Sequence, residues 1–385
     1  MSMDLFDDSE YERRLKNLNN IEVDQLILFN RPDLFYYSGT GLDGVLFKSG
    51  NENVRYIRRN IELGKNESKI KTEFMPSFRT FRDIGKNNNI GKLGLELDML
   101  PYKTVKYLEK TLNPVNIVDI SEQLRIIRSV KSDKEQYYMK IAAKQTDESF
   151  EDVVDLIKPG MTELEISAKI EYFLRRDGHP GYINVRMFQH NLTSLSYVMA
   201  GDSTASLNSV FGPVSGQGNC RLHKNGPSKR KIKNNEVVLI DTTGVYEGYT
   251  ADETRSIFIG KPEDNLYHGL EVAKEIQKYC EKNMIEGKKP SELYIELIQM
   301  ANEYGLSENF MGYKQDRVPF IGHGIGLELD EFPIITEKYE RELKEGNIIA
   351  VEPKFIFDNP KSGVGIEDSY IVRKGKAERI TKHPW

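Results

Sequence analysis

Two aspartates are of immediate chemical interest in the segment 237–259, which joins two runs of β-forming residues through a glycine-containing turn. Because side chains alternate along each run, Asp241 ends an apolar face of the first run and Asp252 lies in the middle of the second. Two neighbouring buried carboxylates are unfavourable unless a cation lies between them. The pattern therefore indicates either a cation site or a solvated hairpin in which Asp252 pairs with Arg255.

Three further residues of the same chemistry follow in the C-terminal half of the chain. His323 lies between glycines, and Glu352 and Glu367 each interrupt an apolar, strand-like run. Taken singly, such a histidine is usually structural and such glutamates usually face outward. Together with the two aspartates, they make four carboxylates and one imidazole, the ligand set for two divalent ions that share bridging acids. Hydrolases with two metal ions use this arrangement to hold a hydroxide and to stabilise a tetrahedral oxyanion.

The elements that must position these residues are amphipathic helices and antiparallel strands. A capping box at Thr162 and Glu165 predicts the start of a helix that ends near residue 177. The hairpin turn is predicted at Gly244 and Gly248. The other predicted elements are helices over 134–156, 264–284 and 290–304, and closing strands over 347–355 and 365–372. Since helices and antiparallel strands are segregated, the fold class is α+β.

The chain divides by pattern into two predicted domains, 1–122 and 123–385. The first has the short helices and strands of a compact α/β domain and shows no cluster of catalytic residue types. The second contains all five candidate ligands. We therefore expect the chemistry to reside in residues 123–385.

Composition and charge narrow the class of protein. The chain has 385 residues, of which 38% are hydrophobic and 29% charged, as in a soluble globular protein. Its net charge of −5 argues against nucleic acid or an anionic membrane as the main partner. The two cysteines, Cys220 and Cys280, form no CxxC motif, which disfavours a disulfide framework or a thiolate zinc site. With no visible signal peptide and no apolar run near the ~20 residues of a membrane span, we expect a cytoplasmic protein.

The motifs around the five residues resemble those of the pita-bread metallopeptidases, a family that includes methionine aminopeptidase, Xaa-Pro aminopeptidase, prolidase and creatinase. Residues 241–260 are similar to the first metal motif of that family, with ten residues between the two aspartates. GHGIGLELDEFP is similar to its histidine motif, and VEPKF and GVGIEDSYIV to its two glutamate motifs. The resemblance covers essentially the whole chain. It implies an N-terminal creatinase-like α/β domain followed by a catalytic pita-bread domain.

The resemblance also implies a role for each of the five residues. Asp241 would bind one metal ion, and Asp252 and Glu367 would bridge two ions. His323 and Glu352 would complete the second ion, with Glu352 also acting as the base that deprotonates the bridging water. The implied cofactors are two divalent ions, with Mn, Co, Fe and Zn all compatible with carboxylate and imidazole ligands.

Three features concern the substrate rather than the metal. His223 lies 18 positions before Asp241, near where the family has a substrate-facing histidine, although an exposed loop residue is an equal alternative. The second histidine of the histidine motif is replaced by Asp330, whose carboxylate cannot stabilise an oxyanion but can pair with a substrate ammonium. The segment Gly178–Leu222 is extended relative to typical members, and we expect it to reshape the pocket wall.

The function implied by the resemblance is that of an Xaa-Pro aminopeptidase or Xaa-Pro dipeptidase. Such an enzyme would remove the N-terminal residue from a peptide or dipeptide and would act as a homodimer. Asp330 leaves open a non-peptidase enzyme on the same scaffold, either a creatinase-like C–N hydrolase or a metal-dependent lyase. A catalytically inactive binding module is the third alternative, disfavoured because all five ligand positions carry competent side chains.

Overall fold

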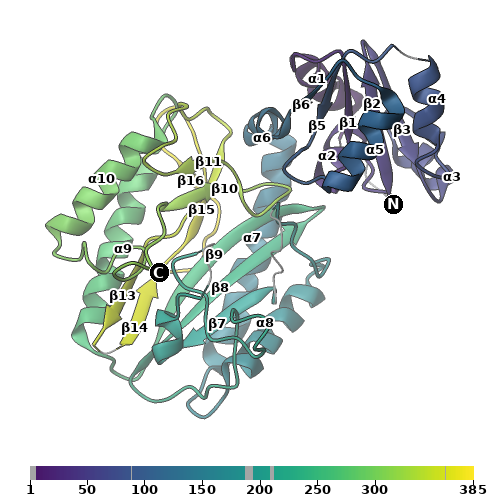
Figure 1. Cartoon of the computed structure of the whole chain (residues 1–385). Helices are drawn as coiled ribbons and strands as arrows, with labels where there is room; N and C mark the ends of the chain where they lie inside the picture. Colours follow the sequence, from purple (N-terminus) through teal and green to yellow (C-terminus); the bar gives the residue numbers. More distant parts are fainter. Residues whose placement is uncertain (1–5, 88, 187–193, 209–211, 360) are drawn as a thin grey trace. The chain divides into compact units, whose positions relative to one another are not determined.

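The chain forms two units, one made of Met1–Arg128 with Arg186–Phe188 and the other of Ser129–Val185 with Gln189–Trp385. The structure is a computed structural model that describes residues 6–87, 89–186, 194–208, 212–359 and 361–385 (Figure 1). Part of the segment Gly178–Leu222, namely residues 187–193 and 209–211, lies outside the described residues.

The first unit is built on a six-stranded mixed sheet with the strand order β4-β3-β2-β1-β5-β6. Its strands are β1 (Gln25–Leu28), β2 (Gly44–Ser49), β3 (Glu52–Ile57), β4 (Lys71–Phe74), β5 (Lys92–Leu95) and β6 (Asn116–Asp119). Its helices are α1 (Asp8–Leu18), α2 (Arg31–Ser38), α3 (Ile61–Glu67), α4 (Thr80–Asn87), α5 (Tyr102–Leu112) and α6 (Ser121–Ser129), which ends at the start of the second unit. Apolar side chains of the sheet pack with those of α4 and α5 in one core.

The second unit is built around the predicted hairpin, which forms β8 (Glu236–Tyr246) and β9 (Tyr249–Ile259). A third strand, β7 (Ser196–Ala200), pairs antiparallel with β8 and lies in a stretch for which no strand was predicted. The helices α7 (Asp133–Val153) and α8 (Glu163–Arg176) precede this sheet. A short helical turn follows α7 as η1 (Val154–Leu156), and another follows β7 as η2 (Gly201–Ala205). The predicted capping box of Thr162 and Glu165 is confirmed at the start of α8.

The C-terminal part of the second unit adds two more helices and two more sheets. The helices are α9 (Asp264–Asn283) and α10 (Pro290–Glu303). One sheet has the order β11-β10-β12-β15-β16, and the other pairs β13 with β14. The strands are β10 (Gly322–Gly324), β11 (Glu331–Ile335), β12 (Ile348–Val351), β13 (Lys354–Asp358), β14 (Lys361–Gly365), β15 (Asp368–Ile371) and β16 (Glu378–Arg379).

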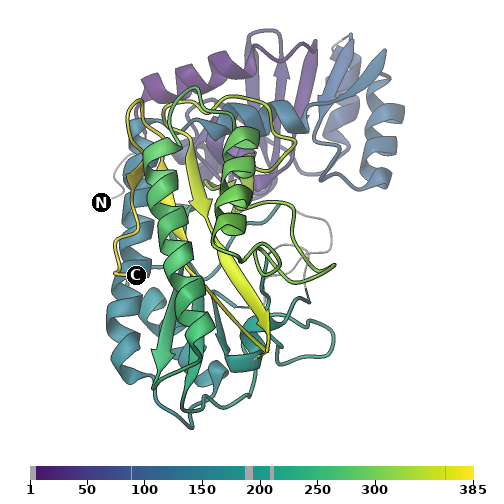
Figure 2. The ribbon, with the colours of Figure 1, turned by 90° about the vertical axis from the view of Figure 1, so that its left-hand side faces the viewer.

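Helices flank the strands of the second unit in two pairs. Apolar side chains of α7 and α8 pack on β7 and β8, while those of α9 and α10 pack with β12 to β15. In Figures 1 and 2 the green helices α9 and α10 run beside the yellow strands of the C-terminal part. The predicted α+β class is thereby confirmed, and the strand faces turned away from these helices are available to form a site.

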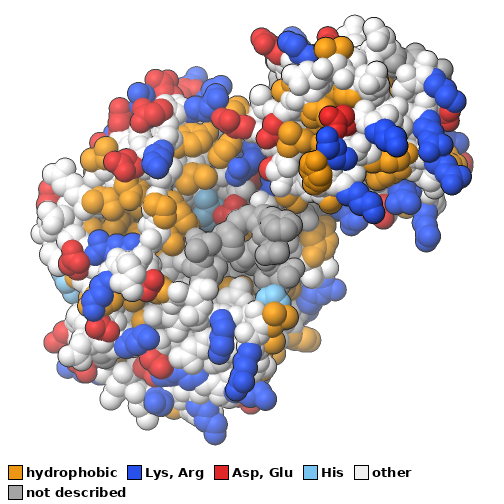
Figure 3. Space-filling model, viewed as in Figure 1, with side chains coloured by type: hydrophobic (Ala, Val, Ile, Leu, Met, Phe, Trp, Pro, Cys, Tyr) orange, Lys and Arg blue, Asp and Glu red, His pale blue; other side chains and the backbone are white. Residues whose placement is uncertain are grey.

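The surface carries charges of both signs. Figure 3 shows Lys and Arg side chains interspersed with Asp and Glu over the part of this face that the second unit forms. Within the described residues, none of the helices combines the length and the apolar character needed to cross a bilayer.

Candidate metal centre

The hairpin β8–β9 places Asp241 and Asp252 on the same face of its sheet. Asp241 lies opposite Thr254 and Thr243 lies opposite Asp252, so the four side chains point to one side. The helices α7 and α8 pack on the other side. Asp252 is 5% exposed, and its Oδ1 accepts a hydrogen bond of 3.2 Å from Thr243 Oγ1. The hairpin thus brings two carboxylates to the face that was predicted to carry them, with Asp252 buried and the side chain of Asp241 26% exposed.

The turn of this hairpin differs from the prediction. Glu247 and Gly248 form a two-residue loop, and both have positive φ, at 50° and 84°. Gly244 instead lies within β8, where a Cβ atom would be 2.0 Å from the carbonyl oxygen of Ala142 in α7. The prediction of a turn at Gly244 is therefore wrong, because the glycine there lets the helix approach the strand backbone.

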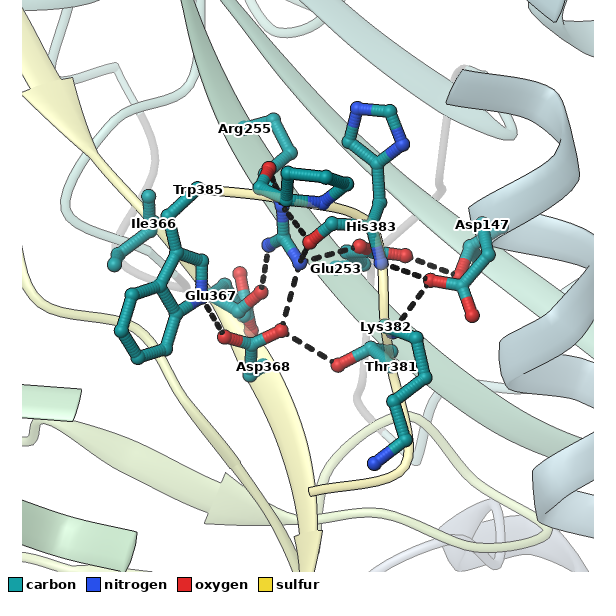
Figure 4. Close-up of polar contacts among 12 residues, drawn as sticks. Asp147, Glu253, Arg255, Ile366, Glu367, Asp368, Thr381, Lys382, His383 and Trp385 are labelled. Carbon is teal, nitrogen blue, oxygen red and sulfur yellow. Dashed lines mark hydrogen bonds and ion pairs between the residues drawn. The ribbon is translucent and has the colours of Figure 1, made fainter. Parts of the chain in front are cut away.

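Arg255 does not pair with Asp252, so that alternative is wrong as well. Because side chains alternate along β9, Arg255 points to the opposite face. There its Nη2 lies 2.6 Å from a carboxylate oxygen of Glu253 and 2.8 Å from one of Asp368 (Figure 4). Its Nη1 also donates a hydrogen bond to the backbone carbonyl oxygen of Glu367 at 2.8 Å. The buried guanidinium thus helps to hold the backbone of a candidate ligand from behind the site.

The C-terminal segment closes over the same guanidinium, as Figure 4 shows. Arg255 donates to the carbonyl oxygen of His383 at 2.7 Å, and Trp385 Nε1 donates to Asp368 Oδ2 at 2.6 Å. Asp147 in α7 accepts hydrogen bonds from the backbone amides of Lys382 and His383 at 2.6 Å and 2.7 Å. These contacts fasten the end of the chain to the back of the hairpin.

Glu352 and Glu367 lie where strands are interrupted. The predicted strand 347–355 is divided into β12 and β13 at Glu352, and the predicted strand 365–372 begins properly only after Glu367, where β15 starts. Glu367 is bridged to β9 by two backbone hydrogen bonds with Thr254, of 3.0 Å and 3.2 Å. Both glutamates are buried, so the outward-facing alternative is wrong.

His323 lies in β10 and faces both glutamates. Its Nε2 is 3.8 Å from Glu352 Oε1 and 3.9 Å from Glu367 Oε1. Its Nδ1 is 3.1 Å from the carbonyl oxygen of Gly324, a contact that places the proton on Nδ1. The Nε2 lone pair is then free to act as a ligand. One ligand atom from each of Asp252, His323 and Glu367 lies within 4.8 Å of the other two.

Lys354 is a member of the cluster that was not predicted. Its Nζ lies 2.8 Å from Glu352 Oε2, 3.1 Å from Glu367 Oε2 and 3.2 Å from Asp241 Oδ2. The signal was present in the sequence, because residues two apart along an extended chain share a face and Lys354 follows Glu352 by two. Gly365 pairs with Lys354 across β13–β14, and a Cβ atom there would be 2.5 Å from Lys354 Cγ.

The electrostatics of the cluster show an excess of negative charge. Burial, reinforced by the charges of Glu367 and Asp241, raises the pKa of Asp252 well above its usual range. Burial lowers the pKa of Lys354, but the neighbouring carboxylates outweigh this effect and hold it well above the usual value. Four carboxylates facing one ammonium remain under-compensated, and the donor set of oxygens and one imidazole nitrogen suits a divalent cation.

The cluster lines a cavity of about 100 Å³ in the second unit. Asp330 also lines the cavity, with its Oδ1 3.7 Å from His323 Nδ1. His223 is not among the described residues that line it, and its neighbour Leu222 is 82% exposed. The structure thus brings together Asp241, Asp252, His323, Glu352, Glu367 and Asp330, and it leaves His223 apart.

The wall of the cavity comes in large part from the segment Gly178–Leu222. Its apolar contributions are Ile183, Val185, Leu195, Tyr197 and Val214, which lie with Leu329 around the acidic centre. Described residues of this segment thus line the cavity. That the segment reshapes the pocket relative to other family members stays a prediction. An acidic cluster beside apolar side chains in one cavity suits a small substrate with one polar reacting group.

Comparison with known proteins assigns the family. The profile of metallopeptidase family M24 matches residues 137–374, and that of the creatinase/prolidase N-terminal domain matches residues 11–130. Among curated proteins, the chain is 26% identical to an Xaa-Pro dipeptidase of Pyrococcus furiosus over 376 residues, which cover 96% of this chain and 97% of the relative.

Solved structures agree over the same length. An Xaa-Pro dipeptidase from Bacillus anthracis superposes with a TM-score of 0.82 at 26% identity, covering 98% of each chain. A prolidase from Pyrococcus horikoshii OT3 gives a TM-score of 0.81 at 25% identity, covering 98% of this chain and 99% of that one. The family expected from the motifs is confirmed: the chain belongs to metallopeptidase family M24 and carries a creatinase/prolidase N-terminal domain.

Proposed function

We propose that the protein hydrolyses the bond after the N-terminal residue of peptides or dipeptides in which proline is second. The observation that carries this proposal is the cavity of the M24 domain, which is lined by four carboxylates and a histidine. It is supported by relatives named Xaa-Pro dipeptidase that match this chain over nearly its whole length. The apolar wall, which includes Val185 and Leu329, suits a proline ring.

The residues present fit a divalent ion at one position. Asp252, His323 and Glu367 would hold it, because their ligand atoms converge, all three are buried, and a cation offsets the cost of burying the acids. A divalent ion there supplies Lewis acidity, which polarises a carbonyl oxygen and makes water a better nucleophile. Mn, Co, Fe and Zn all accept this donor set.

The side chains around that position have separate tasks in the proposal. Glu352 directs Oε1 toward His323 while its Oε2 is held by Lys354, so Oε1 is the oxygen available to take a proton from water. Asp330, on the cavity wall, provides a counter-charge for the α-ammonium group of the substrate.

The experiment that tests the proposal is a hydrolysis panel with the protein reconstituted with Mn or Co. Ala-Pro, Ala-Pro-Ala and Ala-Ala-Ala separate a dipeptidase, an aminopeptidase specific for proline and a general aminopeptidase. Cleavage of none of the three after confirmed metal loading would overturn the proposal.

A hydrolase of non-peptide C–N bonds on the same scaffold is the second candidate. The observation in its favour is Asp330, which lies on the cavity wall in place of the histidine expected from the family motif. Creatine added to the panel tests this candidate, since its cleavage with no peptide cleaved would replace the first proposal.

We also propose, from the resemblance, that the protein is a homodimer. Four large apolar side chains are exposed on the described part of the first unit, Leu63 at 38%, Phe74 at 54%, Tyr102 at 75% and Val115 at 84%, and a second copy would cover such side chains. Sedimentation velocity at micromolar concentration is expected to show a dimer. A fully active monomer would contradict this.

A further inference from the structure

We propose that the ammonium group of Lys354 takes the place of one of the two metal ions, so that the centre binds a single divalent ion through Asp252, His323 and Glu367. The inference rests on the metal centre of the proposed function but not on its substrate. The two-ion centre implied by the motifs fits these residues only in part, and the side chain responsible is Lys354.

The ammonium group occupies the position between three of the five expected ligands. Its Nζ lies within 2.8–3.2 Å of carboxylate oxygens of Glu352, Glu367 and Asp241. An ammonium group has three N–H donors and no acceptor, so these three contacts can use all of them. Asp241, the residue expected to bind the first metal ion, thus has Lys354 as its cation.

Each glutamate divides its two oxygens between two sides of the centre. Glu352 and Glu367 direct Oε2 to Lys354. Both direct Oε1 toward His323 Nε2, at 3.8 Å and 3.9 Å. The arrangement is that of carboxylates shared by two cations, with the ammonium group on the side of Asp241 and a metal position on the side of His323.

The local structure keeps Lys354 in the centre. Its backbone is paired with Gly365 in β13–β14, which fixes its side chain on the same face as Glu352. Its aliphatic chain runs where the missing Cβ of Gly365 leaves room, since that atom would lie 2.5 Å from Lys354 Cγ. Lys354 is 1% exposed. An ion that displaced it would leave a buried ammonium group without its carboxylates, which is costly.

The first test is the number of ions bound. The protein is stripped with a chelator and titrated with Mn²⁺, and the bound metal is counted by elemental analysis after gel filtration. We expect one ion per chain, with the electron paramagnetic resonance spectrum of an isolated Mn²⁺. Two tightly bound, spin-coupled ions would overturn the inference whether or not any variant folds.

The second test uses variants whose expected results differ between one ion and two. Asp241→Asn is expected to leave the Kd for Mn²⁺ within about threefold, because Asp241 pairs with Lys354, whereas Asp252→Asn weakens binding by about 100-fold or more. In a two-ion centre both variants would lose metal, and that result would overturn the inference.

The third test removes the lysine itself. Lys354→Ala is expected to open a second position and to raise the count to two ions, while Lys354→Arg keeps the count at one. Lys131→Ala is the matched control, since Lys131 is also a buried lysine paired with a carboxylate, Glu331 at 2.9 Å, but it does not line the cavity. A count of one in a folded Lys354→Ala variant would contradict the assignment.

The outcomes also separate this inference from the proposed substrate. One bound ion without cleavage of the peptide panel would overturn the proposed function and leave the inference intact. Two bound ions with cleavage of Ala-Pro would do the reverse. Absence of binding by the wild-type protein would overturn both.

Discussion

At the scale of single residues, Glu352 is the one on which the proposed chemistry depends most. Its Oε2 is held by Lys354, which leaves Oε1, beside His323, as the oxygen that can accept a proton.

For Glu352→Gln we expect kcat to fall by ~10²–10⁴, because the amide cannot accept the proton of the attacking water. The bound metal count should not change, since Asp252, His323 and Glu367 hold the ion in the proposed centre. The measurements are steady-state kinetics on Ala-Pro and elemental analysis. Glu163→Gln is the matched control, a buried glutamate that lies outside the cavity lining. Near wild-type turnover in Glu352→Gln would show that the base is another residue.

Asp330 is expected to act on substrate binding rather than on the chemical step. Asp330→Asn removes the charge with little change of shape, so KM for peptides with a free N-terminus should rise by the equivalent of ~1–3 kcal/mol. N-acetylated peptides provide the comparison, because they lack the ammonium group. Unchanged kinetics in the variant, or equal turnover of acetylated peptides by the wild type, would refute the pairing.

At the scale of elements, patterns local in sequence predicted most of what the structure contains. The capping box of Thr162 and the hairpin over 237–259 were predictable because each depends on residues close in the chain. Strand β7 was not predicted because it lies in a Gly- and Ser-rich stretch and is stabilised by pairing with residues of β8 that lie 38 to 46 positions away in sequence. Lys354 was not predicted because a lysine is usually exposed, and nothing near it in sequence shows that it is buried among carboxylates.

His179 makes a testable link between elements, since it follows α8 and contacts β8. Its Nδ1 accepts from the backbone amide of Gly181 at 2.9 Å, and its Nε2 donates to the carbonyl oxygen of Thr243 at 3.1 Å. Burial, together with nearby Arg175, lowers the pKa of His179 to about 4, although the hydrogen bond to Thr243 opposes this. The imidazole is therefore neutral in the folded protein at neutral pH.

The free energy of unfolding should depend on pH through His179. The contribution of neutral His179 to the free energy of unfolding is present in full above the unfolded pKa of about 6.5. It is lost as pH falls toward the folded pKa of about 4, because only the unfolded state takes up the proton in that window. Between pH 7.5 and pH 5.0 the loss due to this group is about 2 kcal/mol. Urea unfolding of His179→Gln, which does not titrate, should lose that much less than the wild type. Equal losses would contradict the assignment.

At the scale of the whole molecule, Arg186 belongs to a different unit from the residues that immediately precede it in sequence. Arg186 is part of the first unit, whereas residues 129–185 belong to the second. It contacts Asp33, 153 positions earlier in the chain, and Asp98, 88 positions earlier. The local sequence pattern could not predict these contacts, because nothing near Arg186 in sequence identifies such distant partners.

Most of the ion cluster around Arg186 is buried in the first unit, although Asp98 is exposed. Asp33 lies 2.9 Å from Arg186 and 3.1 Å from Arg128. Burial raises the pKa of Asp33, but the two arginines outweigh it and lower that pKa. Beside it, burial and the charge of Asp33 raise the pKa of Glu96 well above its usual range. Removing one arginine would leave buried acidic groups with too little positive charge.

Arg186→Met is therefore expected to destabilise the first unit by about 3–5 kcal/mol, the usual result of removing one partner from a buried ion pair. The matched control is Arg176→Met. Arg176 also pairs with two aspartates, Asp152 at 2.6 Å and Asp177 at 2.7 Å, but it lies on the surface, where its side chain is 44% exposed. Screening by water makes such a pair contribute little, so the control should unfold like the wild type. Hydrogen exchange should locate the change, with faster exchange in β1 and α2 and unaltered protection of β8 and β9. Equal destabilisation by the two variants, or faster exchange confined to the hairpin, would show that Arg186 does not stabilise the first unit as its contacts indicate.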